Sequence, residues 1–172
     1  RRAAWQAGMN LWAIFNAGRC RRWHTHPVMA DYDDRLDAHQ GRVARLAMAL
    51  FPGDTALILA ALIHDDGESI VGDVPNPVKN RLPQVARDAL DEMERIGIDR
   101  MWGHQPALNL DQGKRLRLCD KLDAIMWAAS KAPHLMREPG WQADIIAEVT
   151  ALAAWCGVSG PVADICEPWG MK

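Results

Sequence analysis

Apolar residues recur along most of the chain at the three- and four-residue spacing of amphipathic helices, and no stretch alternates convincingly as a strand does. Prolines and glycines interrupt this pattern at intervals that suit short connections. The last stretch, "GPVADICEPWGMK", is predicted to form an irregular tail. The expected fold class is therefore all-α, a helical bundle. Its predicted helices cover residues 3–16, 36–50, 54–66, 83–97, 111–130 and 141–156.

The composition is that of one globular domain, which we expect to comprise residues 1–172. Hydrophobic residues make up 49% of the chain and charged residues 24%, an ordinary balance for such a domain. The net charge of −2 gives no general basic bias, so nucleic acid is not an expected partner. No apolar run approaches the roughly 20 residues that span a bilayer, so no membrane association is expected.

The amino-terminal stretch "RRAAWQAGMNLWAIF" is basic and then apolar, but Gln6 and Asn10 interrupt the apolar part, which argues against a signal peptide. The four cysteines include no CxxC pair, and two of them lie within apolar helical patterns. Buried, reduced thiols in a cytoplasmic protein are the interpretation we favour.

Two distant histidines are predicted to meet. The helices over 36–50 and 54–66 are joined by the tight "FPGD" turn and should pack antiparallel, with Asp54 or Thr55 as the N-cap of the second. His39 lies eleven residues before Leu50, and His64 lies ten residues after Asp54. At 1.5 Å per residue both histidines lie roughly 15 Å from the turn. They should therefore reach the same end of this hairpin.

An acidic cluster accompanies the second histidine. His64 and Asp65 follow the apolar run "TALILAALI". A cluster of ionisable groups at the end of such a buried helix is costly unless its charge is compensated. A further carboxylate is expected from Asp120, which interrupts apolar neighbours in "RLCDKLDA", or from Asp123 on much the same face. With His39, this set suits a divalent transition metal, namely Co, Mn, Zn, Fe or Ni.

The remaining acidic and basic residues near these motifs receive simpler interpretations. A basic run precedes Asp120, and one of its side chains is a candidate for reaching a longer polyphosphate; its members are Lys114, Arg115 and Arg117. Five aspartates are expected to be solvated, or to contact the ligands rather than the metal: Asp31, Asp33, Asp34, Asp66 and Asp123.

Three motifs between about residues 19 and 125 resemble the HD-domain metal-dependent phosphohydrolases. The likeness is strongest to the branch that contains bacterial 5'-deoxynucleotidases and phage dNTP (dATP) triphosphohydrolases. "RCRRWHTHP" resembles that branch's Arg-Trp motif, and "LDAHQGRVARLA" occupies the place of its first histidine. "IHDDGESIVGDVPNPVK" resembles its HD-x-x-E-x-x-x-GD-x-P-x-P-x-K segment almost position for position. Where the family usually has Glu-His-Ser, this chain has Ala38-His39-Gln40.

The resemblance implies a role for each matching residue. The implied metal ligands are His39, His64, Asp65 and, in preference to Asp123, Asp120. Glu68 matches the catalytic glutamate, and Asp73 matches an aspartate that faces the substrate sugar. Three further positions match residues that contact the nucleotide: Arg22 and Lys79 towards the phosphate, and Trp23 beside the nucleoside, where it favours deoxyribose.

The expected function is removal of the 5'-phosphate from a deoxynucleotide. The runner-up is a dNTP triphosphohydrolase that releases triphosphate, which the compact chain and the basic run before Asp120 favour. A non-catalytic, nucleotide-binding HD module is the third possibility, although neither the ligands nor Glu68 are missing. The expected partner is a small deoxynucleotide, and relatives in this branch imply a homo-oligomer.

Overall fold

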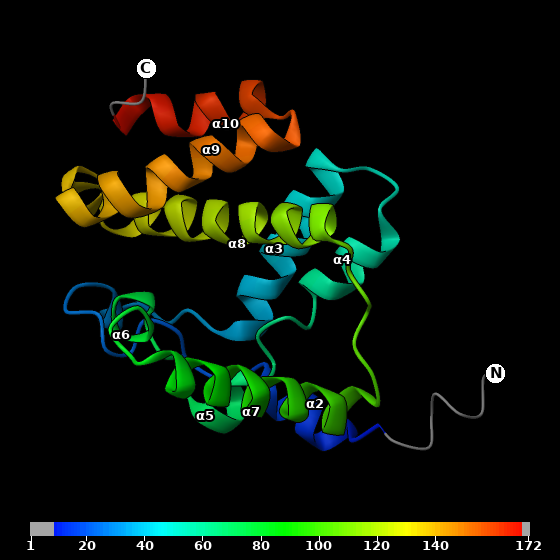
Figure 1. Ribbon diagram of the computed structural model, residues 1–172. Coiled ribbons are helices and arrows are strands. Elements are labelled where there is room, and N and C mark those ends of the chain that lie inside the picture. Colours follow the sequence, from blue (N-terminus) through cyan, green and yellow to red (C-terminus); the bar gives the residue numbers. More distant parts are fainter. Residues whose placement is uncertain (1–8, 170–172) are drawn as a thin grey trace. The chain divides into compact units, whose positions relative to one another are not determined.

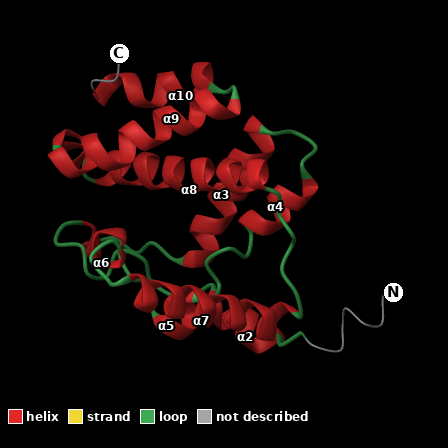
Figure 2. Ribbon diagram, in the orientation of Figure 1, coloured by secondary structure: helices red, strands yellow, loops and turns green. Residues whose placement is uncertain are grey.

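The computed structural model describes residues 9–169. Within this range the chain forms helices joined by turns and loops and contains no strand (Figure 2). The all-α prediction is confirmed for these residues. The first part of the predicted helix 3–16 lies outside them, and the remainder corresponds to α2 (Leu11–Ala17).

The chain divides into two compact units that interleave along the sequence. The first unit contains the residues up to Gly41 together with Leu62–Pro106, and the second contains Arg42–Ala61 together with the residues from Ala107 onward. Helix α3 (Leu36–Leu50) begins in the first unit and continues into the second. Its bounds are those that the sequence predicts.

In the first unit, α2, α5 and α7 pack against one another (Figure 1). Two glycines allow the close approach between α5 and α7. A Cβ atom on Gly67 would lie 2.4 Å from the backbone oxygen of Glu94, and one on Gly97 would lie 2.7 Å from Cδ1 of Ile70. The helices that follow the acidic motif in this unit are α5 (Glu68–Val71), α6 (Asn76–Lys79) and α7 (Gln84–Trp102).

In the second unit, α8 packs against both α4 and α9, and α9 packs against α10. A capping box begins α8, because Asn109 and Gln112 exchange side-chain and backbone hydrogen bonds. Asp54 caps α4 by accepting a hydrogen bond from the backbone of Leu57 at 3.2 Å, as expected. The elements of this unit are α4 (Thr55–Ala61), α8 (Leu110–Lys131), a 3₁₀ turn (Pro133–Arg137), a π-helical segment (Trp141–Ile146), α9 (Ala147–Cys156), α10 (Ser159–Cys166) and a 3₁₀ turn (Glu167–Trp169).

Three predicted elements need correction. The predicted irregular tail contains α10, which buries Val162 and Cys166 one turn apart, and a proline is tolerated in the first turn of a helix. Helix α7 continues past the predicted end at residue 97, because Gly97 provides space for Ile70 rather than ending the helix. Helix α4 ends at Ala61, five residues before the predicted end.

None of the helices among residues 9–169 combines the length and apolarity that crossing a membrane requires. The four cysteines are free thiols, of which Cys119 and Cys166 are buried and Cys20 and Cys156 are half-buried, so the predicted burial holds for two of them.

Candidate metal centre

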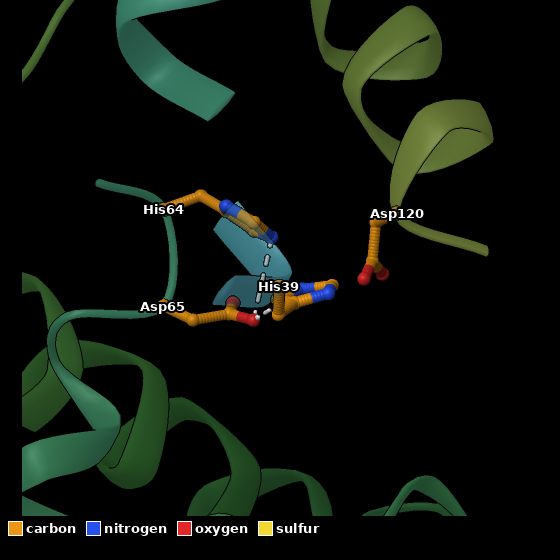
Figure 3. Close-up of side chains that lie close together, drawn as sticks. All are labelled: His39, His64, Asp65 and Asp120. Atoms are coloured by element: carbon orange, nitrogen blue, oxygen red, sulfur yellow. Dashed lines mark ion pairs between the residues drawn. The ribbon is translucent and has the colours of Figure 1, made fainter. Parts of the chain in front are cut away.

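Two histidines and one aspartate of the first unit converge on a single point. Nε2 of His39 lies 3.2 Å from Oδ2 of Asp65, and Nε2 of His64 lies 3.3 Å from the same oxygen (Figure 3). The two imidazole rings are 5.3 Å apart at their centroids. His39 is fully buried, and the other two side chains are largely buried, with 13% and 21% exposed. The predicted meeting of the two histidines is confirmed.

A series of tight turns brings His64 and Asp65 to the same point. After Ala61 the hydrogen bonds change from the helical i+4 pattern to i+3: the amide of Asp66 donates to Ile63, and that of Glu68 donates to Asp65. His64 and Asp65 therefore lie beyond the end of α4, in turns rather than on the surface of the helix. Both side chains approach His39 from these turns.

The distances suit a divalent metal ion. Ligand atoms held about 2.1 Å from a metal lie roughly 3.0 Å apart at octahedral angles and roughly 3.4 Å apart at tetrahedral angles. The separations of 3.2 and 3.3 Å fall between these limits. Two imidazole nitrogens and a carboxylate oxygen are donors that first-row transition metals accept. The group formed by His39, His64 and Asp65 could therefore hold such an ion.

Asp120, the fourth predicted ligand, is a half-buried residue of α8 in the second unit. The alternative, Asp123, is engaged elsewhere in that unit. Its two oxygens accept hydrogen bonds from Nε and Nη2 of Arg42 at 2.6 and 3.1 Å. A carboxylate committed to a bidentate guanidinium pair is a poor candidate for a metal ligand. This contact favours Asp120 over Asp123.

Three aspartates expected to be solvated or close to the ligands are in fact buried and hydrogen-bonded. Asp34, Asp66 and Asp123 expose only 1%, 3% and 2% of their surface. Each accepts hydrogen bonds from side chains that make its burial tolerable: Arg22 and Trp23 for Asp34, Gln40 and Trp102 for Asp66, and Arg42 for Asp123. The expectation that these three aspartates are solvated is therefore wrong. Asp31 and Asp33 are exposed, as expected.

Glu68, the predicted catalytic residue, follows the ligands directly in the chain and begins α5. Burial raises the pKa of its carboxyl to about 9, and the negative charges of Asp65 and Asp73 add to the rise. Arg22 and Lys79 oppose it. Among the described residues no hydrogen-bond donor reaches its Oε2 atom, which is buried. Glu68 is thus a carboxyl group that binds a proton tightly.

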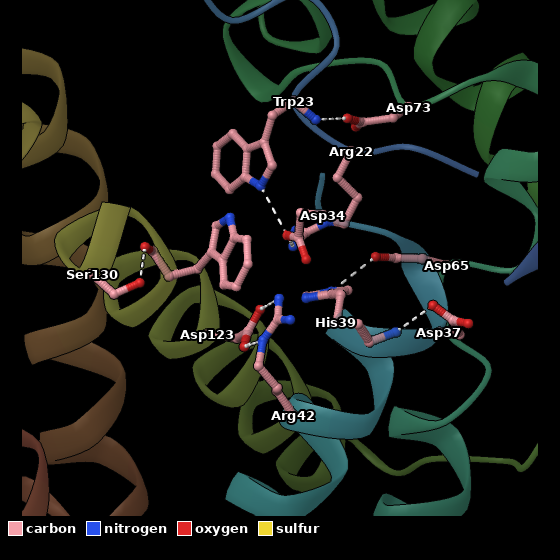
Figure 4. A network of polar contacts seen from close by, with 12 residues as sticks. Arg22, Trp23, Asp34, Asp37, His39, Arg42, Asp65, Asp73, Asp123 and Ser130 are labelled. Carbon is pink, nitrogen blue, oxygen red and sulfur yellow. Dashed lines mark hydrogen bonds and ion pairs between the residues drawn. The ribbon is translucent and has the colours of Figure 1, made fainter. Parts of the chain in front are cut away.

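Arg22, Trp23 and Asp73 lie together in the first unit (Figure 4). The backbone amide of Trp23 donates to Oδ2 of Asp73 at 2.9 Å, and its indole Nε1 donates to Oδ2 of Asp34 at 3.1 Å. Nη1 of Arg22 donates to the same Asp34 oxygen at 3.3 Å. Trp23 has a φ of 62°, in the left-handed region that bulky residues rarely occupy. The structure therefore anchors this tryptophan at both its backbone and its ring.

The predicted phosphate contact Lys79 forms an ion pair with Glu94 of α7 at 2.9 Å. Burial lowers the pKa of its ammonium, but the hydrogen bond and charge of Glu94 outweigh burial, so the pKa is raised overall. Lys79 therefore carries its charge at neutral pH.

The basic run before Asp120 is occupied by contacts within the second unit. Arg115 pairs with Asp54 at 3.2 Å, and Arg117 pairs with Glu148. The ammonium of Lys114 lies 3.7 Å from the centroid of the Trp155 ring. The three side chains that were candidates for reaching a longer polyphosphate therefore all contact other residues of the second unit.

Sequence reasoning missed three residues that organise the site. Gln40 and Trp102 hydrogen-bond to Asp66, and Arg42 holds Asp123. One available signal was Gln40, a polar residue at a position where the helical pattern requires burial. The partners of Trp102 and Arg42 lie 36 and 81 positions away, so helical periodicity offered no signal for them.

No model of a known protein family matches the sequence, and no curated protein is similar to it. The helical fold with its buried histidine and aspartate group is compatible with an HD domain.

Proposed function

We propose that this chain is an HD-type, metal-dependent phosphohydrolase that removes the 5'-phosphate from 2'-deoxynucleoside monophosphates. The observation that carries the proposal is the convergence of His39 and His64 on one oxygen of Asp65, three residues before a carboxyl group with a strongly raised pKa. Perturbed titratable groups beside candidate ligands are typical of hydrolytic sites.

Asp120 is proposed as the fourth ligand. The motif resemblance places a carboxylate in this part of α8, and the Arg42 pair leaves Asp123 unsuited to the role. A six-coordinate metal held by two imidazoles and two carboxylates would still have positions for water and a phosphoryl oxygen.

A divalent metal bound by these residues would lower the pKa of a water molecule towards neutrality and polarise the phosphoryl group. Glu68 is proposed to exchange the proton of the reaction, with the attacking water or with the departing 5'-oxygen. Its buried setting suits donation to the departing oxygen, because a carboxyl that retains its proton near neutral pH can give that proton away.

Arg22 and Lys79 are proposed to face the phosphate and to offset the charge that develops there. Both lie close enough to Glu68 to lower its pKa, which supports a shared site. Trp23 is proposed to pack beside the deoxyribose, and Asp73 to contact the sugar. The hydrogen bond from the backbone of Trp23 to Asp73 links these two residues.

A dNTP triphosphohydrolase is the alternative chemistry for the same site. The basic run before Asp120 favours it from the sequence. Arg115 and Arg117 form ion pairs with Asp54 and Glu148, just as Lys79 does with Glu94, so these contacts are compatible with either chemistry.

The test is hydrolysis of dAMP, AMP, dATP, dGTP and ATP with Co²⁺ or Mn²⁺, with and without EDTA. Orthophosphate from dAMP, at a rate well above that from AMP and abolished by EDTA, is the expected result. Tripolyphosphate from a dNTP would replace the monophosphatase with the alternative chemistry.

Glu68→Gln provides the matched control, because it keeps the shape of the side chain and removes only its ability to transfer a proton. We expect this variant to bind Co²⁺ normally and to lose activity. Absent hydrolysis by the wild-type protein, together with saturable nucleotide binding, would indicate a non-catalytic binding module. Hydrolysis that EDTA leaves unchanged would contradict the metal-dependent mechanism.

A further inference from the structure

A buried hydrogen-bond network lies directly behind the candidate metal centre. Nε2 of Gln40 donates to Oδ1 of Asp66 at 2.9 Å, and Nε1 of Trp102 donates to Oδ2 of Asp66 at 2.7 Å. Gln40 and Asp66 expose only 4% and 3% of their surface. Each carboxylate oxygen therefore has its own neutral donor, in a position that water scarcely reaches.

The network joins two segments that carry metal ligands. Gln40 follows His39 on α3, and Asp66 follows Asp65 in the tight turn. The hydrogen bond between them thus connects the backbone of one ligand to the backbone of another that lies 26 positions away. The segments that it joins carry Nε2 of His39 and Oδ2 of Asp65, which lie 3.2 Å apart.

Helix α7 provides the fixed support for this connection. Trp102 is the last residue of α7, and its indole holds the second oxygen of Asp66. Gly67, the next residue after Asp66, lies directly on the α7 backbone, where an added Cβ would be 2.4 Å from the oxygen of Glu94. The turn is therefore held both by a side-chain hydrogen bond and by backbone packing.

We propose that Gln40, Asp66 and Trp102 are positioning residues that set the distance between His39 and Asp65, and thereby the affinity of the site for its metal. This inference rests on the proposed function, since it assumes that the ligand group binds a metal ion. Groups that orient metal ligands without touching the metal commonly change affinity by about 10- to 100-fold when they are altered.

The network permits a test by reversal of one hydrogen bond. In Gln40→Glu, two carboxylates face each other at a buried position, and Co²⁺ affinity should fall by at least about 10-fold. In the double variant Gln40→Glu/Asp66→Asn, the new amide can donate to the new carboxylate while its oxygen still accepts from Trp102. We expect this double variant to recover most of the lost affinity.

The affinity is measured by titrating the metal-free protein with Co²⁺ and following its visible absorption, which reports the coordination geometry independently of turnover. The shape of the spectrum should change in Gln40→Glu and return in the double variant. Thermal midpoints of the metal-free proteins are measured in parallel, and titrations are run well below the lowest midpoint, so that only folded protein is compared.

Two further variants separate positioning from general damage. Gln84 donates to Asp88 at 2.6 Å in an exposed pair of the same residue types on α7, so Gln84→Glu makes the same chemical change at the surface. It should leave the Co²⁺ affinity unchanged. Trp102→Phe keeps an aromatic ring but removes the indole N–H donor and the volume of the second ring. It should weaken Co²⁺ binding less than Gln40→Glu does.

The outcomes distinguish this inference from the proposed function. If the wild-type protein binds no Co²⁺, the proposed function fails. If the wild-type protein binds Co²⁺ and Gln40→Glu binds it equally well, with an unchanged spectrum, the positioning role is wrong. A loss in Gln40→Glu that the double variant does not restore would also overturn it, since the hydrogen bond would then not be the cause.

Discussion

The ring of His39 lies 5.3 Å from the ring of His64, with the two planes tilted by 50°. Both Nε2 atoms are directed at Oδ2 of Asp65. Two imidazole nitrogens and a carboxylate oxygen at these separations form a donor set that a divalent transition metal accepts.

Metal binding should stabilise the protein. An ion that binds only the folded state contributes about 2.7 kcal/mol when its concentration is one hundred times Kd. We expect Co²⁺ or Mn²⁺ to raise the thermal midpoint of the EDTA-treated protein, and His64→Gln to remove the increase. The measurement is thermal unfolding with and without metal.

His134→Gln is the control for that experiment, because His134 is exposed and lies in a 3₁₀ turn of the second unit. It should retain the full increase in thermal midpoint. An equal increase in wild type, His134→Gln and His64→Gln would show that the metal binds elsewhere.

Asp34→Asn should lower the catalytic efficiency for dAMP without changing the affinity of the protein for its metal ion. Asp34 receives hydrogen bonds from both Arg22 and Trp23, and removing its charge weakens both. We expect kcat/KM for dAMP to fall by about 10-fold, since a hydrogen bond to a charged group contributes roughly 1.5–3 kcal/mol. The preference for dAMP over AMP should also fall, because Trp23 loses its anchor.

The neighbouring residue supplies the control for Asp34. Asp33 is exposed and pairs with Arg21 and Arg35 at the surface, so Asp33→Asn should keep the wild-type kinetics. Unchanged discrimination between dAMP and AMP in Asp34→Asn would remove the support for Trp23 as a sugar filter.

The sequence predicts the helices that depend on local periodicity, and α3 begins and ends as expected. It also predicts the meeting of the two histidines, because hairpin geometry follows from helix rise. It does not predict the turns after Ala61, since their i+3 hydrogen bonds leave no periodic pattern. Helix α10 was missed because its buried positions, Val162 and Cys166, are too few to show a pattern.

The candidate site is predictable to a similar extent. The ligands belong to a specific motif, but the burial of Asp34, Asp66 and Asp123 depends on partners elsewhere in the chain. Gln40 reaches Asp66 across 26 positions, and Arg42 reaches Asp123 across 81. Aspartates are seldom buried without a partner, and the sequence does not show which distant residue donates a hydrogen bond to each of them. From the sequence alone, these three aspartates are therefore expected to be solvated.

Glu68 should make the metal-free protein less stable as pH rises. Its pKa is about 9 in the folded protein, against an ordinary value of 4.5, so between these values the folded state holds a proton that the unfolded state has lost. Unfolding then releases a proton, and raising the pH favours it, by up to about 1.4 kcal/mol per pH unit. Asp65 and Asp73 increase this effect, while Arg22 and Lys79 reduce it.

The measurement is urea unfolding of the EDTA-treated protein between pH 5 and pH 8.5. Glu68→Gln should show a smaller loss of stability over this range than the wild-type protein. Glu138→Gln, at an exposed position, should follow the wild-type curve. Parallel curves for wild type and Glu68→Gln would mean that Glu68 does not hold its proton in the folded state.

Gly67 lies between α7 and the turn that carries Asp65 and Asp66. Its Cβ would lie 2.4 Å from the oxygen and 2.6 Å from the Cα of Glu94, and neither backbone atom can move aside easily. Gly67→Ala should therefore destabilise the protein by about 1–3 kcal/mol and push the turn away from α7. Co²⁺ affinity should fall with it, because Asp65 and Asp66 belong to the same turn.

Gly113→Ala is the matched control, since Gly113 lies within α8 and an added Cβ there meets nothing within 4 Å. Alanine in a helix is favoured over glycine by about 0.5–1 kcal/mol, so this variant should gain stability and keep its metal affinity. Both variants are compared by urea unfolding and Co²⁺ titration. Destabilisation of Gly67→Ala with unchanged Co²⁺ affinity would show that the turn holds its ligands without support from α7.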